Sequence, residues 1–137
     1  MTDVLRPTAQ WREQKHHEAR QAAAGLLSKP ECVLETLFPD ELLDRVDLVL
    51  DAYASTIAAL PKTADGYLAA IDGIKTVILA LNEINVVDGR RRFETAEREV
   101  LCDYIDAVIV GHGIDIDALA ESHGVDRYDL GEEWRDW

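Results

Sequence analysis

Residues 40–61 read DELLDRVDLVLDAYASTIAALP, and this stretch decides the fold. A helix completes one turn about every 3.6 residues, so apolar side chains that recur at alternating steps of three and four lie on one of its faces. That spacing is kept here by Leu43, Val46, Leu50, Tyr53, Ile57 and Leu60. Pro61 ends the helix because proline has no backbone N–H with which to continue the hydrogen bonding. The stretch therefore predicts a long helix with one buried face.

The same periodicity extends over most of the chain. It predicts further long helices over residues 8–27, 67–85 and 94–111, and short helices within residues 28–37 and over 116–122. These elements indicate an all-α fold, a single-domain helical bundle of four long helices plus a short C-terminal helix. The domain covers residues 1–137, and residues 123–137 form a polar, acidic C-terminal tail.

The chain is strongly acidic. It carries 27 Asp and Glu against 14 Lys and Arg, which gives a net charge of −13. Such a surface repels phosphate backbones and anionic lipid, so we expect no nucleic acid and no membrane among its partners. Residues 69–137 hold 16 acidic and 7 basic side chains, against 11 and 7 in residues 1–68. The negative charge is therefore concentrated in the second half of the chain.

Part of the charge in the first half forms a row on the helix of residues 40–61. Asp44, Asp47 and Asp51 recur at helical spacing on the side opposite the apolar stripe. Charged rows of this kind usually face water, so the row is expected to be a solvated outer face and not a site.

The amino terminus lacks the layout of a secretion signal, and a cytoplasmic location is expected.

Motifs with catalytic or metal-binding chemistry are incomplete. Glu13 and His16 have the spacing of a di-iron half-site, but no second such pair follows, so no metal is expected. Residues 118–127 resemble the middle of a DNA-binding helix-turn-helix. However, residues 126–137, which would form the recognition helix, carry five acidic side chains and two arginines. We assign no catalytic residue and no cofactor, and a non-enzymatic role is favoured.

Three short segments resemble a pattern found in small uncharacterised acidic all-helical bacterial proteins. The pattern is an L-N-x-[LI]-N helix end followed by an E-T-x-E-R-E-x-L helix start, here LNEIN at 81–85 and ETAEREVL at 94–101, with a closing EWRDW at 133–137. The resemblance implies a protein similar to the immunity proteins that neutralise bacterial toxins. The amides of Asn82 and Asn85 are expected to tie the connecting loop to both helices.

The first functional hypothesis is an acidic protein-binding module, such as a toxin-neutralising immunity protein or another inhibitor, with a basic protein as its partner. Exposed aromatic rings among charges suit binding anchors, although tryptophans in a tail also commonly pack back onto a bundle. The expected partner-binding residues are Asp126, Asp129, Glu132, Glu133, Trp134 and Trp137.

Two alternatives remain open. One is a small-ligand-binding protein or enzyme whose site lies between the third and fourth long helices and consists of Asn82, Asn85, Glu97 and His112. It requires these four side chains to line one pocket. The other is a self-associating helical scaffold, in which the chain forms a homodimer through a second apolar face.

Overall fold

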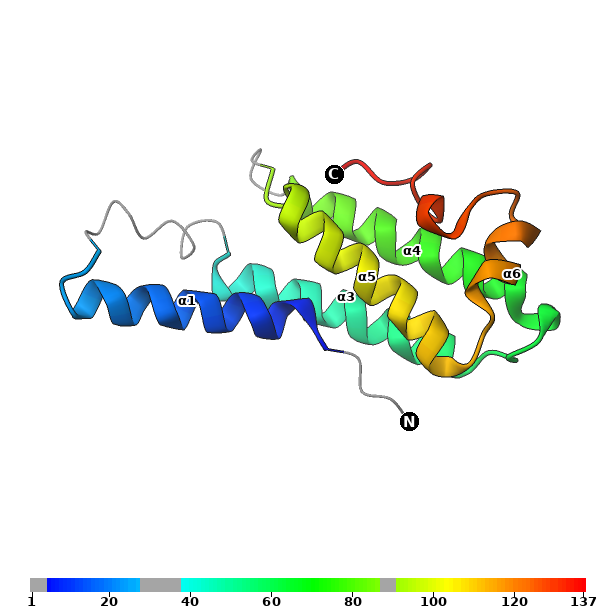
Figure 1. Cartoon of the computed structure of the whole chain (residues 1–137), viewed down its shortest axis with the longest axis horizontal. Coiled ribbons are helices and arrows are strands. Elements are labelled where there is room, and N and C mark those ends of the chain that lie inside the picture. The colour runs from blue at the N-terminus through cyan, green and yellow to red at the C-terminus, as the bar shows by residue number, and fades with distance from the viewer. Residues whose placement is uncertain (1–4, 28–37, 87–90) are drawn as a thin grey trace.

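The helix predicted from residues 40–61 is present as α3, Asp40–Ala58, in a computed structural model that describes residues 5–27, 38–86 and 91–137. The other helices are α1, Pro7–Ala23; α4, Tyr67–Asn85; α5, Thr95–His112; and α6, Ile116–Ser122. Two short 3₁₀ turns, η2 (Ala64–Gly66) and η3 (Arg127–Asp129), are also present in these ranges (Figure 1). The predicted all-α single domain of four long helices and one short helix is confirmed. The short helix expected within residues 28–37 lies outside the described residues.

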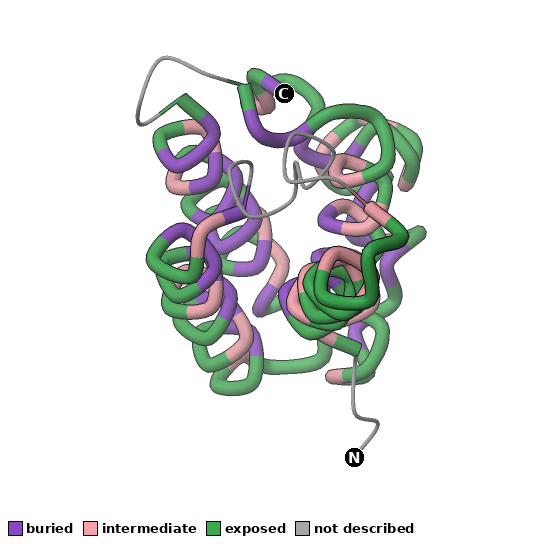
Figure 2. The backbone as a smooth tube through the Cα atoms, turned by 90° about the vertical axis from the view of Figure 1, so that its left-hand side faces the viewer, coloured by how far each residue is buried: buried purple, intermediate pink, exposed green. Residues whose placement is uncertain are grey.

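The core lies between α3, α4 and α5. In Figure 2 the buried positions gather on the sides of the helices that face the middle of the bundle. The predicted stripe of α3 is buried from Leu43 to Ile57, and only its last member, Leu60, is half-buried. Its partners in α4 and α5 are fully enclosed aliphatic side chains, namely Ile74, Leu81, Leu101 and Ile109. Burial of such side chains is the main source of stability in a domain of this size.

Helix α1 departs from the prediction. Of the expected apolar stripe only Trp11 is buried, and Leu26 is 72% exposed. The helix lies antiparallel to α3 and continues past the start of α3, away from the bundle (Figure 1). Among the described residues, the contacts of α1 with the bundle come from its N-terminal half, up to Lys15, which pairs with Asp40.

The aspartate row of α3 agrees with the prediction in part. Asp44 and Asp51 are exposed as expected and Asp47 is half-buried, but all three also pair with arginines on the N-terminal side of the chain, Arg6 and Arg12. The periodicity identified correctly that the row is opposite the apolar stripe. It could not show that an oppositely charged helix lies over it.

The C-terminal residues fold back over the bundle. After η3, Gly131 takes a φ of +88° and lies against Ile74 and Ile78 of α4. Asn82 of α4 then binds the passing backbone twice, since its Nδ2 donates to the carbonyl of Trp134 at 2.7 Å and its Oδ1 accepts from the N–H of Asp136 at 2.9 Å. The segment predicted as a tail is therefore held against α4.

None of the helices in the described ranges is both long and apolar enough to span a membrane.

Candidate functional site

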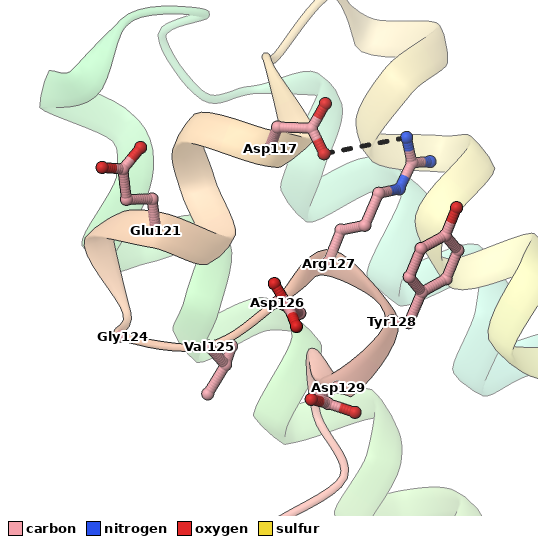
Figure 3. Close-up of a pocket in the computed structure, with 8 residues that line it drawn as sticks. All are labelled: Asp117, Glu121, Gly124, Val125, Asp126, Arg127, Tyr128 and Asp129. Carbon is pink, nitrogen blue, oxygen red and sulfur yellow. Dashed lines mark ion pairs between the residues drawn. The ribbon is translucent and has the colours of Figure 1, made fainter.

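An open acidic cleft lies between α6 and η3 (Figure 3). Its volume is about 920 Å³, and four exposed carboxylates stand around it. We define the acidic cleft by its lining residues, which are Asp117, Glu121, Gly124, Val125, Asp126, Arg127, Tyr128 and Asp129. A smaller depression of about 470 Å³ adjoins it, shares Val125 and Asp129 with it, and adds His123, Glu132 and Glu133.

The local sequence explains how the cleft forms. Asp115 caps α6, because its Oδ1 accepts from the N–H of Ala118 at 3.1 Å. Leu119 and Ala120 are buried and fix α6 to the bundle. At the other end Gly124 has a φ of +77°, a left-handed conformation that glycine adopts without steric cost, and it reverses the chain. The reversal brings η3 beside α6, so the acidic residues of both segments share one surface.

Tyr128 stands at this surface and was missed by the sequence analysis. Its side chain is 85% exposed, which is unusual for a tyrosine in a folded domain. The guanidinium carbon of Arg127 lies 5.6 Å from the centre of its ring, within the range of a cation–π interaction. A signal was available in the sequence, because an aromatic residue between Arg127 and Asp129 interrupts an otherwise charged segment.

Of the described residues that line the acidic cleft, one is basic, namely Arg127. Its Nη1 lies 3.9 Å from Asp117, a weak ion pair between partly exposed groups. It also faces Asp106 of α5, whose burial raises the pKa to about 6, an effect that the charge of Arg127 opposes and that of Asp103 reinforces. The negative charge of the cleft is therefore only partly compensated within the described structure.

The predicted partner-binding residues divide into two groups. Asp126, Asp129, Glu132 and Glu133 are exposed and lie together along the acidic cleft and its neighbouring depression. Trp134, by contrast, is half-buried, with its ring 5.5 Å from the imidazole of His123 and 5.9 Å from the ammonium of Lys75.

Trp137 belongs to the core. It is 8% exposed and packs edge-on against Phe93 at a ring separation of 5.7 Å. In this position its ring is not available to a partner. The exposed aromatic ring of the surface is Tyr128.

The residues of the alternative ligand site are not brought together. Glu97 and His112 lie at opposite ends of α5, about 22 Å apart along the helix axis. His112 is hydrogen-bonded through Nε2 to the carbonyl oxygen of Leu60 at 2.8 Å. Asn85 is fully buried near the other end of α5, and Asn82 binds the C-terminal segment. These four side chains therefore do not line one pocket.

Asn85 has the structural role that the sequence suggested. Its Oδ1 accepts from the backbone N–H groups of Arg92 and Phe93, both at 2.7 Å, and so fixes the approach to α5. Asn82 makes two bonds to the C-terminal segment, which the sequence did not predict. The signature LNEIN therefore organises the backbone around the end of α4.

In the described ranges no group of three or more His, Cys, Asp or Glu side chains is arranged to hold a metal ion. The carboxylates of the acidic cleft are spread around its rim and do not converge on a common point (Figure 3).

Comparison of the chain with protein-family models, with curated proteins and with solved structures gives no match in any of the three.

Proposed function

We propose that this chain is a non-enzymatic protein-binding module that binds a basic protein partner at the acidic cleft. The observation that carries the proposal is the highly exposed Tyr128 among the exposed carboxylates of Asp117, Glu121, Asp126 and Asp129. Tyrosine is enriched at the energetic centres of protein interfaces because it buries a large rigid area and keeps a polar end.

The charge around Tyr128 favours a cationic partner. Residues 115–137 hold eight acidic and two basic side chains. A field of one sign speeds the encounter with an oppositely charged protein and selects against partners of like charge. An arginine of the partner would find both a carboxylate and an aromatic face, the two groups that bind guanidinium best.

The more specific form of the proposal is an inhibitor of the immunity-protein kind, which acts in the cytoplasm by covering the basic surface of a toxin. Support for this form is the resemblance of the LNEIN and ETAEREVL segments together with the acidic cleft. In such a complex the carboxylates would occupy cationic positions that the toxin needs for its own target.

The test is capture of a partner by the purified chain, followed by identification and a binding measurement with the purified partner. Binding is expected at about 50 mM salt and should weaken strongly at about 500 mM, because salt screens exposed charges. The cleft variant combines Asp126→Asn, Tyr128→Ala and Asp129→Asn, and it should lose binding. A matched control with the same change of charge combines Glu41→Gln, Leu48→Ala and Glu99→Gln, all exposed positions on α3 and α5. Equal binding by the two variants would exclude the acidic cleft as the site.

A further inference from the structure

A second acidic surface lies on α3, beside α1, and cations of the N-terminal segment pair with it. The residues that meet there, which we call the ionic seam, are three cations of the N-terminal segment, Arg6, Arg12 and Lys15, and four aspartates of α3, Asp40, Asp44, Asp47 and Asp51. The closest N···O separations are 2.7 Å for Arg6–Asp51, 2.8 Å for Lys15–Asp40 and 2.9 Å for Arg12–Asp44.

Asp47 is the centre of the ionic seam. It is half-buried and is hydrogen-bonded by the hydroxyl of Thr8 and by Arg12 at 3.0 Å and Arg6 at 3.4 Å. Burial alone would raise the pKa of Asp47, but these hydrogen bonds outweigh it and leave the pKa lowered. The surface of α3 is thus built to accept cations, and α1 supplies them.

In the described ranges, few residues of α1 make the apolar part of this contact. Within α1 the buried side chains are Pro7, Thr8 and Trp11, all in its first five positions. Trp11 stacks on Phe38 at 5.2 Å and on Phe93 at 6.1 Å. Most of the charged groups of the seam are partly exposed, and exposed ion pairs stabilise weakly and are screened by salt. Helix α1 is therefore held less firmly than α3, α4 and α5, which share the enclosed core, and it should open before they do.

We propose that α1 is a removable strap, a helix that can leave the bundle, and that the aspartates paired with its cations form a second docking surface, for a basic helix of a partner protein. The chemistry that a partner helix needs follows from α1, which occupies this surface of α3 in the structure. A competing helix needs cations spaced as Arg6, Arg12 and Lys15 are, and one aromatic side chain to replace Trp11 between Phe38 and Phe93. This surface is separate from the acidic cleft, and the inference does not depend on the function proposed for that cleft.

The test uses a fluorescent peptide with the sequence of residues 5–23, added to the full chain, with anisotropy as the readout. In the wild-type chain α1 competes with the peptide. The peptide can bind only to molecules in which α1 has left α3, so its apparent affinity equals the intrinsic affinity multiplied by the fraction of such molecules. The variant Arg12→Ala/Lys15→Ala weakens the strap and leaves the aspartates intact. It should bind the peptide at least about fivefold more tightly than the wild type at about 20 mM salt, since more molecules have the surface free.

Three further variants show where on the protein the peptide binds. The control Lys62→Ala/Arg91→Ala removes two exposed cations elsewhere and should bind like the wild type. Adding Asp44→Asn/Asp47→Asn to the strap variant should abolish the gain. Adding Asp126→Asn/Asp129→Asn instead should preserve it, which separates this surface from the acidic cleft. A gain that appears in the control, or that survives loss of the α3 aspartates, would overturn the inference.

A measurement on the wild type keeps the inference testable if the strap variant does not fold. Amide hydrogen exchange in α1 should become at least about threefold faster between 20 and 500 mM salt, while exchange in α4 stays constant. If α1 exchanges together with α4 at both salt concentrations, it opens only when the whole domain unfolds, and the strap does not exist.

Discussion

Replacement of Asn85 by alanine tests the claim that the LNEIN signature has a structural role. Asn85 is completely buried, and its Oδ1 is the acceptor for two backbone N–H groups, those of Arg92 and Phe93, at 2.7 Å each. Both donors lie in buried residues. Alanine removes the acceptor and leaves these two N–H groups without it in a region that water does not reach.

The structure sets the size of the effect. Each buried donor that loses its partner costs about 1–3 kcal/mol, so two donors cost about 2–6 kcal/mol. One contribution acts in the opposite direction. The Nδ2 of Asn85 is itself buried and has no hydrogen-bond partner among the described residues, and the substitution relieves that cost. We therefore expect a loss of about 2–4 kcal/mol, a large part of the stability of an ordinary domain.

The assay is urea unfolding followed by helical circular dichroism, with Asn82→Ala as the matched control. Asn82 also makes two hydrogen bonds to backbone groups, but it is half-buried and Asp136 is exposed, so water can replace what is lost. The control should lose about 1–2 kcal/mol. If Asn85→Ala costs less than Asn82→Ala, the buried N–H groups are satisfied in another way and the reasoning fails.

Three other substitutions follow from the same structure. Asp106→Asn should stabilise the chain by about 1 kcal/mol at pH 7, allowing for solvent screening, because burial raises the pKa of this carboxyl to about 6. Since that pKa exceeds the ordinary value of 3.8, the cost of the ionised form is present above about pH 6 and disappears below 3.8. In thermal melts the substitution should therefore raise the melting temperature clearly at pH 7 and much less at pH 4. Tyr53→Phe removes the bond from its buried hydroxyl to the carbonyl of Ile105 at 2.7 Å and should lower the unfolding free energy by about 1 kcal/mol in urea titrations. Gly131→Ala should cost at least about 2 kcal/mol, measured as a lower melting temperature, because the new Cβ would overlap Cδ1 of Ile78 and the φ of +88° disfavours any side chain.

The helices could be predicted because their signals are local. Pro39 precedes the start of α3 at Asp40, and Gly113, with a φ of +97°, follows the end of α5, both of which are common residues at helix ends. The buried stripe of α3 was identified because alternating steps of three and four apolar residues have one geometric interpretation. Short-range rules of this kind determine where a helix lies along the chain and which of its faces is apolar.

The pairing of helices and the exposure of single side chains could not be predicted in the same way. Arg12 and Asp47 are 35 positions apart in sequence, and nothing in either local pattern indicates that they meet. A charged row has the same periodicity whether it faces water or another charged helix. Tyr128 and Trp137 stand in similarly polar segments, yet one is exposed and the other is buried against Phe93. That difference depends on where the C-terminal segment crosses α4, which is a property of the assembled bundle.

The two acidic surfaces differ in how their charge is balanced, and this difference underlies the two roles proposed for them. On α3 four aspartates are met by three cations at N···O separations of 2.7 to 3.0 Å, so the attraction is satisfied inside the chain. In the acidic cleft four carboxylates line the surface, and Arg127 pairs with Asp117 at 3.9 Å. The ionic seam shows the chemistry that completes such a surface, namely a helix with spaced cations and one aromatic ring. A partner of the acidic cleft has to supply comparable cations from outside, whereas a partner of α3 must first displace those already bound.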